Sequence, residues 1–153
     1  MPLKSGTPMP SLDGATEWFN GEVKSESLAG KPTLVYFWAV SCYICKNNMP
    51  TIGAWKKEFE GQVNFVSVHM PRQESDTDLE AVKKIMAEFG IDEPVAVDGY
   101  HEIGERFQTQ GYWPYYFLFD ADGNLKSRAA GDVGLKSIEG TLNRLINPEP
   151  VAA

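Results

Sequence analysis

The stretch TLVYFWAVSCYIC, residues 33–45, decides the fold of this chain. Its first six residues form an almost continuously apolar run, which is typical of a central strand covered on both faces. Cys42 and Cys45 follow this run and are the only two cysteines of the chain. The sequence therefore predicts a strand-to-helix turn that carries a dithiol, and thiol–disulfide exchange is the leading interpretation.

The spacing of the two cysteines gives each sulfur its own role. Cys42, at the start of a helix, faces unpaired backbone N–H groups and the positive end of the helix dipole, so we expect it to be the attacking thiolate. Cys45 lies one turn further on the same side and can close or resolve a disulfide with Cys42. The alternatives are an inert pair and a structural zinc site. Zinc takes about four ligands and the chain offers only His69 and His101 besides, so we expect no metal.

Composition limits the partners and the location. The chain has 153 residues, of which 42% are hydrophobic and 23% charged, and this fits one domain with its own core. The net charge of −7 argues against nucleic acid and anionic membranes, so protein thiols or small thiols fit better as partners. Neither a signal peptide nor a membrane segment is visible. With a single dithiol, we expect a cytoplasmic protein, or an extracytoplasmic domain if a leader was removed.

Turn signals and hydrophobic periodicity divide the chain into an irregular lead-in (1–14), one domain (15–147) and a C-terminal tail (148–153). Asn20-Gly21 predicts a hairpin between residues 15–19 and 22–23. After the dithiol, the pattern predicts a helix from Cys45 to Phe59, then, in order, strand 63–69, helix 79–89, strand 94–97, a short helix over 100–107, a hairpin of 115–119 with 125–130, and helix 135–146. This order predicts an α/β fold, a mixed sheet with helices on both faces. The acidic residues 74–80 are expected in a solvated loop and helix start.

From about Ser11 to Ile146 the chain resembles the thioredoxin superfamily, and more closely its TlpA/ResA-like thiol:disulfide oxidoreductases. The matching motifs are Phe37-Trp38-Ala39 before the cysteines, Met49-Pro50 after them, Gly30-Lys31-Pro32, and Trp113-Pro114. Further motifs are similar to the thioredoxin-like domain of DipZ-type membrane proteins, which usually faces outside the membrane: Ser41-Cys42, Val68-His69-Met70-Pro71, Gly90-Ile91, Pro94 to Asp98, and Tyr112-Trp113-Pro114.

The resemblance implies a thioredoxin fold in which Pro114 is a cis-proline beside the dithiol. It also implies that the backbone of Trp113 pairs with a substrate peptide as an added strand. Apart from the resemblance, we expect an aromatic rim around the dithiol that grips apolar substrate segments, made by Trp38, Tyr43, Tyr112, Trp113 and Tyr115. The alternative for Trp38 is a place in the core.

The chain departs from the family pattern at three positions near the dithiol. Ile44 stands where the family commonly has proline. Tyr36 replaces the buried Asp of classical thioredoxins, and Asn48 replaces the Glu of ResA-like members. Both usual proton acceptors for Cys45 are therefore missing from these positions.

His69 is the candidate replacement for the missing acid. It closes a parallel strand whose end lies on the same sheet edge as Cys42, and in its protonated form it would favour the Cys42 thiolate. A histidine satisfied structurally at a strand end is the alternative. His101 is expected to be solvated.

These observations lead to the hypothesis of a thiol:disulfide oxidoreductase. Cys42 forms a mixed disulfide, Cys45 resolves it, no cofactor is needed beyond the dithiol, and a separate protein or thiol donates electrons to what we expect to be a monomer. Two alternatives remain. One is an AhpC-type peroxidase-like antioxidant protein, whose Thr-x-x-Cys context and paired arginine are not visible. The other is a redox-indifferent peptide-binding module that uses the surface of Trp113 and Pro114.

Overall fold

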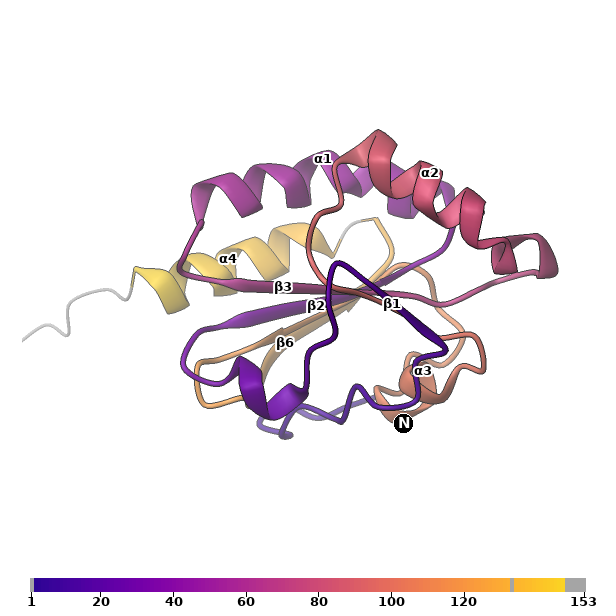
Figure 1. Cartoon of the computed structure of the whole chain (residues 1–153). Coiled ribbons are helices and arrows are strands. Elements are labelled where there is room, and N and C mark those ends of the chain that lie inside the picture. Colours follow the sequence, from indigo (N-terminus) through magenta and orange to yellow (C-terminus); the bar gives the residue numbers. More distant parts are fainter. Residues whose placement is uncertain (1, 133, 148–153) are drawn as a thin grey trace, which may run out of the picture.

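The structure, a computed structural model, describes residues 2–132 and 134–147, so the predicted tail (148–153) lies outside the described residues. A six-stranded sheet in the order β1-β4-β3-β2-β5-β6 forms its centre (Figure 1). β2, β3 and β4 run parallel, whereas β1, β5 and β6 each run antiparallel to a neighbour, so the predicted mixed sheet is confirmed. The strands are β1 (Glu17–Phe19), β2 (Thr33–Trp38), β3 (Asn64–His69), β4 (Val95–Val97), β5 (Tyr115–Phe119) and β6 (Leu125–Ala130).

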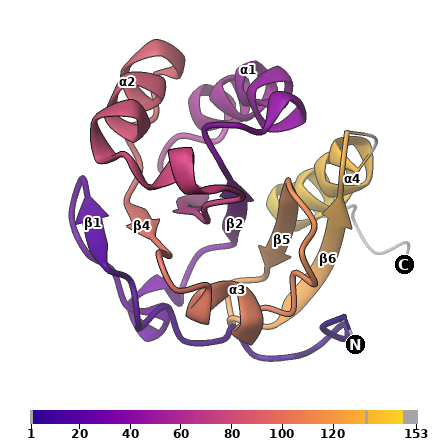
Figure 2. The same cartoon turned by 90° about the vertical axis from the view of Figure 1, so that its right-hand side faces the viewer.

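Helices cover both faces of this sheet, as predicted. α1, α2 and α4 pack on one face, and the short α3 lies on the other together with the N-terminal segment (Figure 2). Within the described part of the chain, no helix combines the length and apolar character needed to cross a membrane. The helices are α1 (Tyr43–Glu58), α2 (Leu79–Phe89), α3 (Glu102–Arg106) and α4 (Leu135–Ile146), with two 3-10 turns, η1 (Ser25–Leu28) and η2 (Glu74–Thr77).

The position of β2 explains why the first six residues of the stretch 33–45 are almost continuously apolar. Successive side chains of a strand point to opposite faces, so Leu34, Tyr36 and Trp38 enter the core under α1, α2 and α4. Val35 and Phe37 enter the second core, on the side of α3. All six residues of β2 are buried. The turn that carries Cys42 therefore lies at the C-terminal end of a central strand.

The predicted N-terminal hairpin is wrong. β1 pairs antiparallel with β4, with Trp18 opposite Ala96, and no strand follows the Asn20-Gly21 turn before η1. Both turn residues have positive φ, 64° and 100°, so the turn signal was correct. The side-chain amide of Asn20 donates to the carbonyl of Glu93 at 3.0 Å, which fixes the turn to the loop before β4 instead of to a partner strand of its own.

The N-terminal segment packs firmly although it contains no regular element. Residues 2–14 form one isolated bridge, between Pro8 and Asn124, and otherwise neither helix nor strand. Leu3 and Leu12 are nevertheless buried in the core on the α3 side. The segment therefore closes the face of the sheet that the short α3 leaves uncovered.

Candidate active site

Cys42 and Cys45 form a disulfide at the start of α1, as the spacing predicted. Their Cα atoms are 5.3 Å apart. Cys42 is the N-cap of the helix, and its sulfur accepts a hydrogen bond from the N–H of Cys45 at 3.1 Å. A thiolate on Cys42 would keep this donor and the favourable end of the helix dipole.

An open pocket of about 620 Å³ lies over Cys42, whereas Cys45 does not line it. Two exposed aromatic side chains, Tyr43 and Tyr112, form part of its wall, and they are 76% and 59% exposed. A larger pocket of about 830 Å³ lies at the C-terminal end of α1 and is lined by no cysteine. The smaller pocket over Cys42 is therefore the candidate active site. The lining residues of the smaller pocket are Ser41, Cys42, Tyr43, Ile44, Arg72, Gly111, Tyr112 and Trp113.

The Trp113-Pro114 peptide bond is cis, as the resemblance implied. The indole N–H of Trp113 donates to the carbonyl of Met70 at 2.7 Å, and its ring meets His101 edge to face. Within residues 2–132 and 134–147, the backbone N–H and carbonyl of Trp113 have no hydrogen-bond partner. His101, expected to be solvated, is partly buried, and its Nε2 forms a hydrogen bond with the carbonyl of Pro71 at 2.7 Å.

Two members of the expected aromatic rim lie elsewhere. Trp38 is fully buried, and its indole N–H donates to the hydroxyl of Ser67 at 3.2 Å. Tyr115 is also buried and stacks on Phe117 in the opposite core. The prediction that Trp38 binds substrate is wrong, because the last residue of a central strand still points into the core. Its alternative, a core position, is correct.

His69 lies beside the turn that leads to Cys42, but as a buried neutral group. Its Nε2 accepts the backbone N–H of Val40 at 3.2 Å, and Nδ1 has no partner among the described residues. Burial lowers the pKa of His69 to about 4, although the negative charge of Asp76 opposes this shift. A cationic His69 that supports the Cys42 thiolate near neutral pH is therefore contradicted, and a hydrogen-bond acceptor for Val40 is what the geometry provides.

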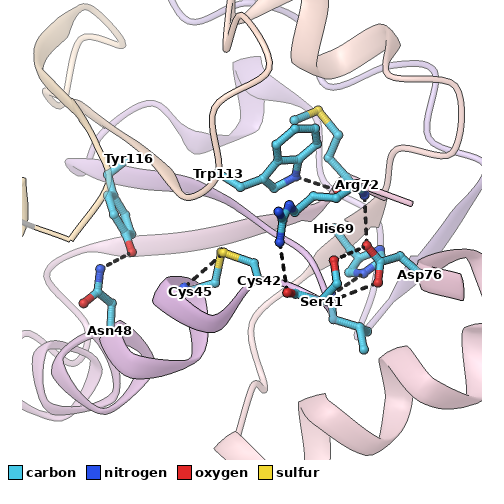
Figure 3. The surroundings of a disulfide bond; sticks show 11 residues. Ser41, Cys42, Cys45, Asn48, His69, Arg72, Asp76, Trp113 and Tyr116 are labelled. Carbon is cyan, nitrogen blue, oxygen red and sulfur yellow. Dashed lines mark hydrogen bonds between the residues drawn. A yellow bond between two sulfur atoms is a disulfide. The ribbon is translucent and has the colours of Figure 1, made fainter. Parts of the chain in front are cut away.

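Asp76 is the site residue that the sequence interpretation missed. It lies in η2 and is 1% exposed, so the expected solvated position is wrong for this residue. Its carboxylate accepts the N–H of Ser41 at 3.0 Å, the O–H of Ser41 at 2.8 Å and the N–H of Arg72 at 2.9 Å (Figure 3). The predicted strand order could have indicated this contact, because the loop after β3 and the turn after β2 lie at the same end of a parallel sheet.

The two positions that lost their family acid hold neutral groups. The side-chain amide of Asn48 donates to the hydroxyl of Tyr116 at 2.9 Å, and the ring of Tyr116 stacks on that of Tyr36. The hydroxyl of Tyr36 donates to the carboxylate of Glu93. Burial raises the pKa of Tyr116 to about 12 and that of Tyr36 well above its ordinary value, so neither phenol is a base near neutral pH.

A cysteine pair at a helix start, one sulfur lining a pocket and a cis-proline next to that pocket define a thioredoxin-fold protein with an active-site disulfide. The chain belongs to the Redoxin family, whose pattern matches residues 4–142.

Known proteins agree with this assignment. The thiol-disulfide oxidoreductase YkuV of Bacillus subtilis is 41% identical over 145 residues, which cover 94% of this chain and 97% of YkuV. The protein DipZ of Mycobacterium tuberculosis is 29% identical over 150 residues, 95% of this chain but only 21% of DipZ. The solution structure of a thioredoxin-like protein in the oxidised form matches with a TM-score of 0.88 and 40% identity, covering 97% of this chain and 100% of the other. The predicted thioredoxin fold is confirmed.

Proposed function

We propose that this protein is a thiol:disulfide oxidoreductase that alternates between a Cys42/Cys45 dithiol and the disulfide. The observation that carries this proposal is the disulfide at the start of α1, with Cys42 lining an open pocket and Cys45 behind it. Its relative YkuV is named for the same activity. The dithiol itself stores the electrons, so the exchange needs no further cofactor.

In the reducing direction, the Cys42 thiolate attacks a substrate disulfide. One sulfur of the substrate joins Cys42 in a mixed disulfide, and the other leaves as a thiolate. Cys45 then loses its proton to solvent and attacks the sulfur of Cys42, which releases the second thiolate. Two electrons have moved to the substrate, and a separate thiol or protein donor reduces the disulfide again.

Substrate peptides add beside Trp113 and Pro114 in this proposal. Two observations support it. The backbone N–H and carbonyl of Trp113 have no partner within the described part of the chain, and strand addition uses such free groups. Tyr43 and Tyr112 expose aromatic faces in the same pocket. His69 acts as a positioning residue, because its acceptor nitrogen holds the N–H of Val40 in the turn before Cys42.

We place the protein in a reducing compartment such as the cytoplasm, as a monomer. A single cysteine pair and no second, structural disulfide suit that compartment. An extracytoplasmic location is the competing proposal.

Trapping tests the function. A Cys45→Ser variant should accumulate mixed disulfides on Cys42, whereas Cys42→Ser should not, because only Cys42 lines the pocket. The trapped partners also report the direction of electron flow and the compartment. A redox-indifferent binding module would keep its partners in the Cys42→Ser/Cys45→Ser double variant, and consumption of peroxide as fast as disulfide exchange would favour the peroxidase. Equal trapping by both single variants contradicts the proposal.

A further inference from the structure

Arg72 is the only charged residue among the eight that line the pocket over Cys42. It follows β3, and its side chain is exposed. One guanidinium N–H donates to the carbonyl of Ser41 at 2.9 Å, and the backbone N–H of Arg72 donates to Asp76 at 2.9 Å. The cation is therefore held one residue away from the attacking sulfur, as Figure 3 shows.

The remaining N–H groups of the Arg72 guanidinium have no hydrogen-bond acceptor in the described part of the chain. An arginine side chain has five N–H donors, and only one of them finds an acceptor within residues 2–132 and 134–147. No carboxylate among these residues forms an ion pair with the guanidinium of Arg72, and Asp76 contacts only its backbone N–H. The chain has 21 acidic side chains for 14 basic ones. The pocket lining contributes no Asp or Glu either. The pocket thus presents an unpaired cation on its wall beside exposed aromatic faces.

We propose that Arg72 forms a carboxylate subsite, so that the protein prefers disulfides with a carboxylate close to the reacting sulfur. Such a carboxylate occurs on an acidic small thiol or on an Asp or Glu next to a cysteine in a peptide. A guanidinium binds a carboxylate through two parallel hydrogen bonds, and the faces of Tyr43 and Tyr112 suit the apolar stem between carboxylate and sulfur. The inference rests on the proposed function, because the subsite matters only if Cys42 attacks a disulfide.

The reaction that the subsite favours is the first exchange. The thiolate of Cys42 forms a bond to the substrate sulfur nearer the bound carboxylate, and the substrate S–S bond breaks. The other half leaves as a thiolate that takes a proton from solvent. Cys45 completes the two-electron reduction and releases the anionic thiol. Arg72 changes no oxidation state and only binds the part of the substrate that does not react.

Three small disulfides of different charge test the subsite: 3,3′-dithiodipropionate (anionic), bis(2-hydroxyethyl) disulfide (neutral) and cystamine (cationic). The rate of their reduction by the reduced protein is measured for the wild type, Arg72→Gln and Arg72→Lys. Arg72→Gln should lower the anionic-to-neutral rate ratio by about threefold to tenfold and raise the cationic-to-neutral ratio. Arg72→Lys should keep only part of the preference, because an ammonium retains the charge but not the two parallel hydrogen bonds. Because each ratio is taken within one variant, a change in the reactivity of Cys42 itself cancels.

The matched control is Arg144→Gln, which removes the same charge from the last turn of α4, outside the pocket. It should leave both ratios unchanged. A second arm compares two peptide disulfides that differ only in Asp or Asn beside the cysteine, and it shows whether the carboxylate comes from a peptide or from a small thiol. Equal ratios in the wild type and Arg72→Gln in both arms, or an equal change in Arg144→Gln, would overturn the subsite alone. Failure to reduce even the neutral disulfide would overturn the proposed function as well.

Discussion

The carboxylate of Asp76 accepts both the backbone N–H and the hydroxyl of Ser41, at 3.0 and 2.8 Å. The two residues are 35 positions apart in the chain, yet Ser41 directly precedes Cys42. Since Asp76 is buried, these hydrogen bonds replace water, and the loop after β3 fixes the turn after β2. The orientation of the attacking sulfur therefore depends on a residue outside the cysteine motif.

Replacement of Asp76 by Asn should destabilise the protein. One carboxylate oxygen becomes an NH₂ group that faces a donor of Ser41 or Arg72, so a part-buried donor loses its acceptor and the buried amide is left with a mismatched partner. We expect the free energy of unfolding to fall by about 1–3 kcal/mol in urea titrations. Glu74→Gln is the control, because it makes the same change on an exposed residue of η2 and should cost less than about 0.5 kcal/mol. Equal losses would mean that the Asp76–Ser41 contact does not stabilise the fold.

His69 should make stability depend on pH. Burial lowers its pKa from 6.5 to about 4, so between these pH values the unfolded chain binds more protons than the folded one. The free energy of unfolding should therefore fall as the pH drops from 6.5 towards 4, by about 3 kcal/mol in full. His69→Gln should flatten this part of the curve. An unchanged slope in His69→Gln would show that His69 is not the group responsible.

The thiolate of Cys42 should not need His69 as a cation. In a Cys45→Ser background, the pH dependence of Cys42 alkylation is measured with and without His69→Gln. Because His69 is neutral near pH 7, the two titrations should superimpose above about pH 6. A higher Cys42 pKa in the His69→Gln variant would restore the cationic role.

The sequence predicted those parts of the fold and site in which local and tertiary signals agree. The apolar run of β2 and the cysteine spacing each point to one structure, and the family motif supplied the cis bond before Pro114. The partner of β1 was not predictable in this way, because a three-residue edge strand next to an Asn-Gly turn is equally compatible with a hairpin. The buried Asp76 was missed because nothing local shows which acid of 74–80 turns inward.

Two adjacent acids should differ sharply in their contribution to stability. Asp92 and Glu93 each lie 2.8 Å from the ammonium of Lys56, but their side chains are 85% and 3% exposed. Glu93→Ala leaves the buried hydroxyl of Tyr36 without its acceptor, whereas the ammonium of Lys56 keeps Asp92 and the carbonyl of Gly90, so we expect a loss of about 1–3 kcal/mol. Asp92→Ala removes a solvated partner and should cost less than about 1 kcal/mol. Urea titrations measure both, and similar costs would contradict the argument from burial.

A carboxylate at position 48 should give Cys45 the proton acceptor that the chain lacks there. Asn48 is buried and donates to the hydroxyl of Tyr116, so Asn48→Glu places an acid in a site where burial raises its pKa towards neutrality. Such a group can take the proton of Cys45 during resolution, which an amide cannot do. We expect the rate of disulfide reduction, measured from pH 5.5 to 9, to reach half its maximum about one pH unit lower. Asn48→Gln, which has the same length as Glu without the charge, should keep the wild-type profile. If both variants follow the wild-type curve, position 48 does not communicate with the dithiol.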